Sequence, residues 1–262
     1  MKPILDIKEY SYTIGGLAIL DGVTLSADGG EYLSIIGPNG AGKTTLLKCI
    51  MRIHTGGSGF ISIAGKTLDS YSQRELAKLV SYVPQGNGRA APFTIREYLM
   101  TGRYPHLSPF TSFTREDRRA VDDALDITGI TALADRRLDT LSGGERQTTA
   151  IAAALVQGGR VMLLDEPTTF LDPRHESDIL SLIATINRER GITIVSVTHN
   201  INSAALHSDR IAILKRGRVV FHGPSEDVMA NGILEDVYGR SFRFIDHPDG
   251  AGKIIIPEAV AR

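Results

Sequence analysis

The chain has 262 residues, of which 42% are hydrophobic and 23% are charged, so it can bury the core of one large domain or two small ones. Its 29 basic and 30 acidic side chains give a formal net charge of -1, which disfavours a general nucleic-acid binder. Cys49 is the single cysteine, so an internal disulfide is excluded and a reducing compartment is favoured. Glycine is over-represented, with 27 residues against a usual share of roughly 7%.

The hydropathy pattern narrows the setting further. Residues 1–6 reach an acidic side chain before an apolar run of signal-peptide length develops, so we expect no export signal. No stretch approaches the roughly 20 apolar residues that cross a bilayer. We therefore expect a soluble cytoplasmic protein, or a peripheral subunit of an assembly that spans a membrane.

The first elements in chain order are predicted to be extended. Residues 1–32 are expected to form an antiparallel layer at a sheet edge, with a turn at Gly15-Gly16. Short β-branched runs that barely alternate with polar residues follow, as is typical of strands buried on both faces. These runs cover 34–36, 161–164, 192–197 and 211–214.

The middle of the chain is predicted to be helical. Residues 86–158 indicate a helical insertion between two strands, with helices at 94–100, 114–127 and 143–157 and a loop at 101–113 that carries Pro105 and Pro109. A further helix over 174–189 is predicted from its apolar spacing, with Asp172 as N-cap and Pro173 in the first turn. A small hairpin is expected from 242–245 and 253–256, around a turn at 247–250.

Strands that alternate with helices predict an α/β protein with a mostly parallel sheet. We interpret the whole chain, 1–262, as one domain. Its core would comprise 1–85 and 159–240, its helical subdomain 86–158, and its tail 241–262.

A phosphate-binding loop is predicted at residues 37–44. Their sequence, Gly-Pro-Asn-Gly-Ala-Gly-Lys-Thr, fits G-x-x-x-x-G-K-[ST] between a strand and a helix expected from Lys43 to about Ile53. Inward-facing backbone N–H groups and the helix N-terminus would cradle an anion. Lys43 would reach the β- and γ-phosphates, and the Thr44 hydroxyl could coordinate Mg²⁺. This context disfavours the alternative of a plain glycine-rich turn.

Two acidic residues complete the predicted nucleotide site. Asp165 ends the apolar strand at 161–164, which would place its carboxylate at the sheet edge beside the phosphate loop to hold the magnesium shell. Glu166 would face the γ-phosphate and orient or deprotonate the attacking water. An apolar run followed by Asp-Glu is a weak signal alone, and the phosphate loop strengthens it.

Residues 141–147, Leu-Ser-Gly-Gly-Glu-Arg-Gln, can be interpreted in two ways. Ser142 and Glu145 form the S-x-x-E pattern of a capping box at the start of a helix. The box does not need Gly143 or Gly144. In a first helical turn, each of these glycines lowers helix stability by roughly 1 kcal/mol relative to alanine. Bare N–H groups there suggest a second phosphate-binding surface, and its use on one nucleotide implies a second copy of the chain.

The phosphate loop, the Leu-Ser-Gly-Gly-Glu segment and Leu-Leu-Asp-Glu-Pro at 163–167, in this order, resemble the nucleotide-binding subunit of an ATP-binding cassette (ABC) transporter. The resemblance extends over essentially the whole chain. It implies a P-loop NTPase core with an N-terminal antiparallel β layer and an inserted α-helical subdomain, which uses ATP and Mg²⁺.

The motifs and the resemblance together predict the site residues. For nucleotide binding these are Tyr12, Asn39, Gly40, Ala41, Gly42, Lys43, Thr44, Thr45, Gln85, Ser142, Gly143, Gly144, Glu145 and Asp172. The magnesium ligands would come from Thr44, Gln85 and Asp165. The predicted catalytic residues are Lys43, Glu166 and His199, the last of which resembles the histidine that contacts the γ-phosphate.

Some assignments stay open. Tyr10 is close enough in sequence to compete with Tyr12 as the aromatic residue that stacks on adenine. The helix after Glu145 is less basic than is usual in the family, and Asn200 follows His199 where aspartate is common, a change that we expect to be tolerated. The other histidines lack metal-ligand spacing and are interpreted as surface or packing residues.

The resemblance implies a head-to-tail pair of subunits that sandwiches two ATP molecules. It further implies permease subunits contacted by the helical subdomain, an indirect substrate-binding protein, and a peripheral location on the cytoplasmic side of the inner membrane. No nucleic-acid partner is expected.

Segments 83–85, 94–97, 101–106 and 165–172 resemble ATPases of iron-siderophore, haem and cobalamin importers. Importers of other substrates and a soluble ABC ATPase, such as one for cluster assembly, remain alternatives. A regulatory module without hydrolysis is disfavoured because Glu166 and His199 are both present.

Overall fold

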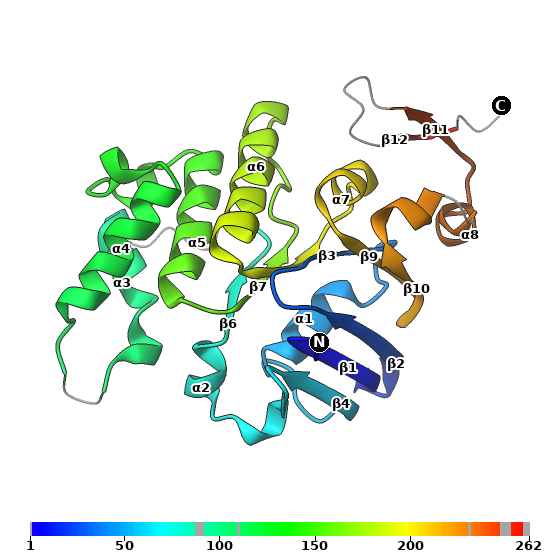
Figure 1. Cartoon of the computed structure of the whole chain (residues 1–262), viewed down its shortest axis with the longest axis horizontal. Helices are drawn as coiled ribbons and strands as arrows, with labels where there is room; N and C mark the ends of the chain where they lie inside the picture. The colour runs from blue at the N-terminus through cyan, green and yellow to red at the C-terminus, as the bar shows by residue number, and fades with distance from the viewer. Residues whose placement is uncertain (1, 87–91, 109–110, 230–231, 247–252, 259–262) are drawn as a thin grey trace. The chain divides into compact units, whose positions relative to one another are not determined.

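The computed structural model describes residues 2–86, 92–108, 111–229, 232–246 and 253–258 (Figure 1). The chain divides into two compact units, of which the first comprises Met1–Ser70 and Thr193–Arg262 and the second comprises Tyr71–Ile192. The second unit contains the predicted helical segment together with the elements that flank it on both sides. Pro109 and the expected turn at 247–250 lie outside the described residues.

The first unit combines two sheets, a C-terminal hairpin and short helices. Its N-terminal elements are β1 (Leu5–Ile14), β2 (Leu17–Ala27), β3 (Tyr32–Ile36), α1 (Lys43–Ile50), β4 (Ser58–Ile63), β5 (Lys66–Thr67) and η1 (Leu68–Ser70). Its C-terminal elements are β8 (Thr193–Val197), α7 (Ile201–His207), β9 (Arg210–Lys215), β10 (Arg218–Pro224), η5 (Ser225–Met229), α8 (Ile233–Tyr238), β11 (Phe242–Asp246) and β12 (Lys253–Pro257).

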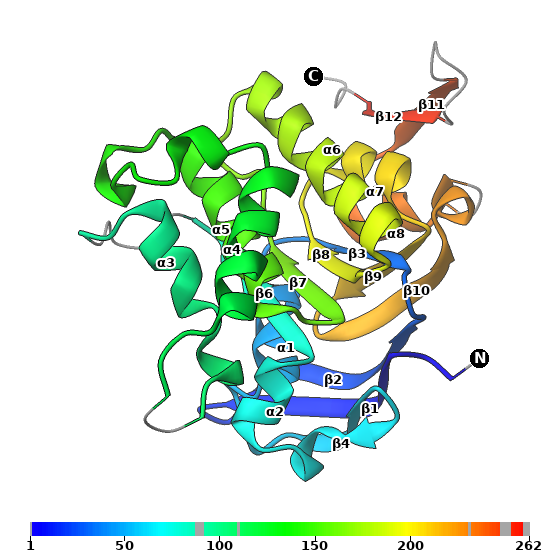
Figure 2. The same ribbon diagram turned by 60° about the vertical axis from the view of Figure 1, so that its left-hand side comes forward.

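The predicted antiparallel layer is confirmed. Strands β1, β2 and β4 lie side by side in both ribbon views, in the order β2-β1-β4-β5, and Gly15 and Gly16 form the turn between β1 and β2 (Figures 1 and 2). The expected C-terminal hairpin is also confirmed, because β11 and β12 pair antiparallel from Phe242 opposite Pro257 to Asp246 opposite Lys253.

Parallel pairing around β3 positions the phosphate loop. Every residue of β3 and β8 is buried, and the two strands run parallel from Tyr32 opposite Ile194 to Ile35 opposite Val197. On the other side of β3, β9 pairs parallel with it and β10 pairs antiparallel with β9. Strands covered on both faces need no polar face, which explains their continuous apolar runs.

Helix α1 is shorter than predicted. It ends at Ile50, and Arg52 has a φ of 56°, in the left-handed region that a right-handed helix does not use. This helix end is not predictable from the sequence, because Met51, Arg52 and Ile53 do not include the glycine that commonly follows a helix.

The second unit is dominated by helices. Its elements are α2 (Gln73–Ala77), β6 (Val80–Val83), α3 (Ile95–Thr101), η2 (Tyr104–His106), α4 (Arg115–Ile127), η3 (Thr131–Leu133), η4 (Leu138–Thr140), α5 (Gly143–Gln157), β7 (Val161–Asp165) and α6 (Pro173–Arg190). Helices α3, α4, α5 and α6 agree with the four predicted ones. Among its described residues, the predicted loop at 101–113 contains a short 3-10 turn, η2, which tolerates Pro105 in its first turn because a missing N–H costs nothing there.

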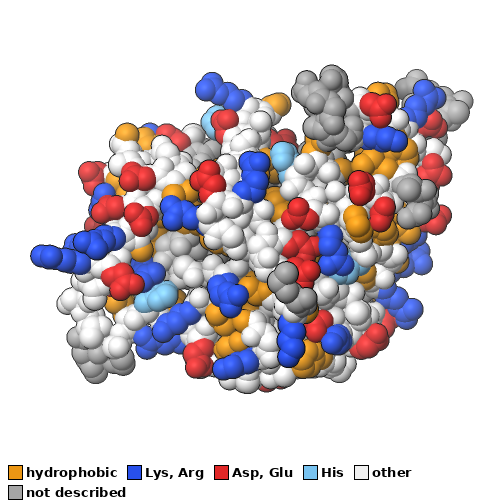
Figure 3. All heavy atoms as spheres, in the orientation of Figure 1, with side chains coloured by type: hydrophobic (Ala, Val, Ile, Leu, Met, Phe, Trp, Pro, Cys, Tyr) orange, Lys and Arg blue, Asp and Glu red, His pale blue; other side chains and the backbone are white. Residues whose placement is uncertain are grey.

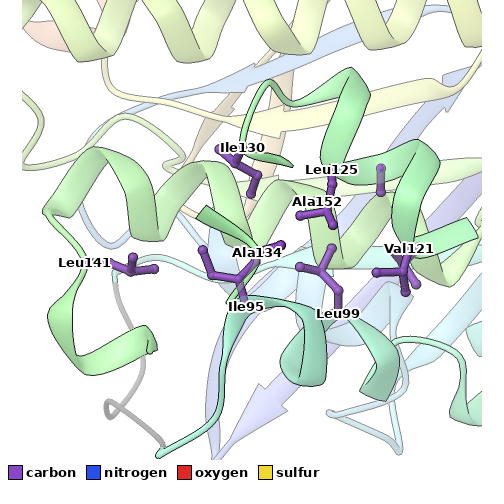
Figure 4. Close-up of a cluster of buried hydrophobic side chains, with 10 residues drawn as sticks. Ile95, Leu99, Val121, Leu125, Ile130, Ala134, Leu141 and Ala152 are labelled. Atoms are coloured by element: carbon purple, nitrogen blue, oxygen red, sulfur yellow. The ribbon is translucent and has the colours of Figure 1, made fainter. Parts of the chain in front are cut away.

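Side chains from α3, α4 and α5, together with Ile130, Ala134 and Leu141 from the segment between α4 and α5, form one apolar core (Figure 4). Its fully buried members include Ile95, Leu99, Val121, Leu125 and Ala152. The three helices begin with capping boxes at Thr94, Thr114 and Ser142, so orphan N–H groups at each start are satisfied locally. The packing and the caps together explain why this polar-rich segment folds.

A buried ion pair ties the 101–113 segment to α4. Arg103 Nε lies 2.8 Å from Asp117 Oδ1, and the two side chains are only 9% and 5% exposed. The second Asp117 oxygen accepts from the Thr114 N–H at 2.8 Å. This N–H, together with the Arg103 guanidinium, lowers the pKa of Asp117 from 3.8 to about 2.

We expect Asp117→Asn to destabilise the protein by about 3 kcal/mol, because Arg103 keeps its buried charge without an anionic partner. In the parent, the pKa of folded Asp117 lies below its ordinary value, so this stabilisation is present above about pH 4 and is lost as the pH falls toward 2. Urea unfolding of both proteins between pH 7 and pH 3 measures the difference. Asp122→Asn is the matched control, because its ion pair with Arg96 is exposed and should contribute less than about 1 kcal/mol.

The surface carries both signs of charge. Figure 3 shows basic and acidic side chains interspersed on the visible face, in agreement with the net charge of -1. Within the residues that the structure describes, no helix is long and apolar enough to cross a membrane.

Candidate nucleotide-binding site

The predicted phosphate loop leaves β3 through a position that only glycine can occupy. Gly37 has a φ of 148°, and a Cβ added there would lie 2.0 Å from the carbonyl oxygen of Leu214. Gly40 and Gly42 also adopt left-handed φ values, of 75° and 102°. Gly42 is the N-cap of α1 and brings no side-chain hydrogen bond to the first helical turn. The positive end of α1 therefore opens into the loop through backbone alone.

Lys43 is held inside this loop. Its ammonium donates to the carbonyl oxygens of Gly37, at 2.8 Å, and Pro38, at 3.1 Å, and the residue is only 6% exposed. The positive charge of Lys43 and the backbone N–H groups of the loop thus lie close together, as binding of a polyphosphate requires. The remaining predicted loop residues divide by exposure: Asn39 and Gly40 are exposed, Ala41 and Gly42 are buried, and Thr44 and Thr45 are half-buried.

The structure separates the two tyrosines that the sequence left open. Tyr10 is 8% exposed, and Gly57 packs so closely that an added Cβ would lie 2.2 Å from the Tyr10 hydroxyl. Tyr12 is partly exposed and stacks on His54, with ring centroids 5.3 Å apart and an interplanar angle of 16°. Tyr12 therefore has the more accessible ring, and His54 is a stacking partner that the sequence did not indicate.

His199 lies between β8 and α7 with its side chain exposed. The next residue, Asn200, is the N-cap of α7 and accepts from the Ser203 N–H at 3.0 Å. Asparagine and aspartate cap helices about equally well. The departure from the common aspartate therefore preserves the local structure that follows His199.

In the second unit, Asp165 ends β7 as predicted and is 1% exposed. The Tyr82 hydroxyl donates to Asp165 Oδ2 at 3.1 Å. Burial, together with the negative charge of Asp165, raises the pKa of Tyr82 well above its ordinary value, so Tyr82 remains a donor at neutral pH. Sequence reasoning missed Tyr82. Its place in β6, which pairs parallel with β7, is the signal that could have found it.

Glu166 is held by two donors to one oxygen. Its Oε2 accepts from Gln85 Nε2 at 2.5 Å and from Thr169 Oγ1 at 3.1 Å. Glu166 also has a φ of 52°, a conformation that is uncommon outside glycine and that is concentrated at functional sites. The structure thus brings together Gln85 and Glu166, which are 81 residues apart, and adds Thr169, which the sequence did not single out.

The capping box at Ser142 is confirmed. Ser142 Oγ accepts from the Glu145 N–H at 3.2 Å, and Glu145 Oε2 accepts from the Ser142 N–H at 2.7 Å. This N–H, with the Arg136 guanidinium 2.9 Å from the other oxygen, holds the pKa of Glu145 below its ordinary value. The two glycines differ: a Cβ added at Gly143 would make only an ordinary contact with Leu171 Cδ2, at 3.9 Å, whereas one added at Gly144 would overlap the His175 ring. The second phosphate-binding surface stays a prediction.

Asp172 caps α6 as predicted. Its Oδ1 accepts from the N–H groups of Arg174, at 3.0 Å, and His175, at 3.1 Å. The second oxygen lies 2.6 Å from His175 Nδ1. The His175 N–H and ring hold the pKa of Asp172 below its ordinary value, so the side chain is anionic at neutral pH.

Comparison with known proteins agrees with these motifs. The family described as ABC transporter matches residues 20–169. The chain is 37% identical to the ferric enterobactin transport ATP-binding protein FepC of Escherichia coli K12, over 93% of this chain and 90% of that protein. It is 37% identical to the iron(3+)-hydroxamate import ATP-binding protein FhuC of Bacillus subtilis, over 93% and 91%. It is also 36% identical to the hemin import ATP-binding protein HmuV of Streptomyces coelicolor, over 93% and 86%.

Solved structures show the same fold. CbiO1 of Clostridium perfringens, part of the ABC transporter complex cbiONQ, superposes with a TM-score of 0.80 at 31% identity and covers 92% of this chain and 96% of its own. The dimeric bacterial ABC transporter cassette MJ0796 superposes with a TM-score of 0.72 at 29% identity, over 84% and 98%. The motifs, the mixed α/β fold and these matches together show that the chain belongs to the ABC transporter family, as an ATP-hydrolysing, ATP-binding subunit.

Proposed function

We propose that this chain powers a membrane importer for an iron-siderophore, haem or cobalamin. The observation that carries the proposal is the set of relatives that match nearly the full length of the chain and that are named for transport of ferric enterobactin, iron(3+)-hydroxamate and hemin. In the family that the sequence resembles, the transported substrate does not contact the ATPase subunit. The permease and the substrate-binding protein would therefore determine which of these substrates is transported.

We propose that nucleotide phosphates bind at the loop 37–44. The bare backbone of this loop and the buried ammonium of Lys43 supply the positive potential for that role. The residues that would hold Mg²⁺ are Thr44, Gln85 and Asp165, and their hydroxyl, amide and carboxylate oxygens are the hard donors that this ion prefers. Bound Mg²⁺ would offset phosphate charge as it develops during hydrolysis.

Glu166 is the proposed general base. Its carboxylate would orient or deprotonate the attacking water, while the Gln85 amide and the Thr169 hydroxyl fix the carboxylate through Oε2. His199, exposed after β8, would contact the γ-phosphate. Tyr12 would stack on adenine, since its ring is more exposed than that of Tyr10.

The working form in this proposal is a head-to-tail pair of chains. Residues Ser142 to Glu145 of one copy would contact the nucleotide held by the other copy, and Asp172 would lie in the loop that reaches across. The dimeric MJ0796 cassette supports such pairing. The helical segment 86–158 would act on a permease at the cytoplasmic side of the inner membrane, and that permease would receive its cargo from a substrate-binding protein.

Co-expression with the permease of an iron-siderophore, haem or cobalamin importer tests the transport role. We expect the chain to move from the soluble fraction to the membrane fraction, and cells to take up the labelled iron-siderophore, haem or cobalamin only when both proteins are present. Fractionation and uptake assays measure the two results. Expression without the permease is the control, and recovery in the soluble fraction in both cases would favour a soluble ABC ATPase, such as one for cluster assembly.

A further inference from the structure

The side chain nearest to Gly144 belongs to a residue that the motifs do not include. A Cβ added at Gly144 would lie 2.4 Å from His175 Cδ2, and the three nearest atoms to it all belong to the His175 ring. An alanine there would therefore overlap the ring and force it to move. The imidazole of α6 thus lies directly on the bare backbone of the first turn of α5.

His175 is itself held in place. Its Nδ1 lies 2.6 Å from Asp172 Oδ2, and its backbone N–H donates to Asp172 Oδ1. Asp172 is therefore both the cap of α6 and the acceptor that sets the orientation of the His175 ring. The result is one chain of contacts that runs from Asp172 through His175 to Gly144.

The contact between His175 and Gly144 borders a cavity. The cavity has a volume of about 190 Å³ and is lined by residues of α5 and α6, among them Gly144 and His175, and by Thr128 and Ile130, which follow α4. Beside this cavity, the ring of His175 is the nearest side chain to Gly144, so it joins the first turn of α5 to the start of α6.

We propose that His175 is a positioning residue, which locks the Ser142–Glu145 turn to the loop that ends at Asp172 and presents both to a second copy of the chain as one rigid surface. This inference rests on the proposed head-to-tail pairing. The loop also connects Glu166 to Asp172, so His175 links the residue that activates water to the turn that binds the nucleotide of the other copy. A loose His175 would cost pairing and turnover while leaving nucleotide binding by a single chain intact.

The test compares two replacements of His175 and one of Asp172. His175→Ala removes the ring and its hydrogen bond, His175→Phe keeps a ring against Gly144 without the hydrogen bond, and Asp172→Ser keeps a cap without the second oxygen. We expect the alanine variant to lower kcat and ATP-driven pairing about five- to tenfold, as is typical for residues that couple two sites. The phenylalanine and serine variants should retain more pairing than the alanine variant.

Pairing is measured by light scattering with ATP in a Glu166→Gln parent, in which hydrolysis is blocked. Two further measurements separate positioning from simple damage: the melting temperature, and ATP affinity at concentrations where the chain is monomeric, which should change less than about twofold. Ser177→Ala, an exposed change two residues further along α6, is the matched control and should behave as the parent.

Three results would overturn the inference. Pairing and kcat of His175→Ala equal to those of the parent would show that the contact does not position the turn. Losses matched by a fall in melting temperature and in monomer ATP affinity would show a merely structural role. A Glu166→Gln parent that stays monomeric with ATP would refute the proposed pairing and this inference together, whereas the first two results leave the proposed pairing intact.

Discussion

Lys43→Ala should abolish tight ATP binding and hydrolysis. The Lys43 ammonium is buried within the loop, where it donates to the carbonyl oxygens of Gly37 and Pro38, so no other side chain of the loop brings a positive charge to this position. Charge-assisted hydrogen bonds contribute about 1.5–3 kcal/mol each, and loss of two to the phosphates weakens affinity on the order of a hundredfold or more. Titration with a fluorescent ATP analogue measures this change directly.

The control for this prediction lies on the same helix. Lys48→Ala removes an identical charge from the last turn of α1, and we expect it to bind the nucleotide as the parent does. Both variants should melt within a few degrees of the parent. If Lys43→Ala bound ATP with parental affinity, the assignment of residues 37–44 as the phosphate loop would be wrong.

Glu166→Gln should bind ATP but hydrolyse it about a thousandfold more slowly. The amide has nearly the same shape as the carboxylate, and its oxygen can still accept hydrogen bonds from Gln85 and Thr169. The replacement therefore removes the general base but keeps the hydrogen bonds around it. General-base catalysis contributes about 10²- to 10⁴-fold to a rate, which sets the expected loss. A phosphate-release assay measures the rate of hydrolysis, and titration with ATP measures the binding affinity.

The same variant should accumulate as a pair of chains in the presence of ATP, because the γ-phosphate that holds the pair together is not removed. Size-exclusion chromatography with ATP, and again with ADP, measures this effect. Glu189→Gln, an exposed change near the end of α6, is the control and should hydrolyse ATP normally and remain monomeric after turnover. Near-normal turnover of Glu166→Gln would contradict the proposed role of Glu166.

Local interactions made much of the fold predictable. The capping box at Ser142 and the cap at Asp172 follow from residues three or fewer positions apart, and the structure confirms both. The buried strands were predictable because a strand that is buried on both faces has a nearly continuous apolar sequence. The end of α1 was predicted less well, because a left-handed Arg52 has no local signal.

The contacts that set the site were beyond local reasoning. Tyr82 reaches Asp165 across 83 residues, and Gln85 reaches Glu166 across 81, since β6 and β7 pair in the sheet. The predicted role of Gln85 rested on resemblance alone, whereas its hydrogen bond to Glu166 is visible only in the fold. Thr169 was missed because a threonine three residues after an acidic residue has no distinctive pattern.

The glycines show most clearly which features follow from the sequence and which are decided only by the tertiary structure. The spacing of Gly37, Gly40 and Gly42 before Lys43 was enough to identify a phosphate loop, because its chemistry depends on consecutive backbone groups and a helix start. Tertiary structure alone decided that Gly37 is required by the Leu214 carbonyl and Gly144 by the His175 ring. The physical reason is that close packing joins atoms that are distant in the chain, so the space available to a side chain is a property of the folded molecule.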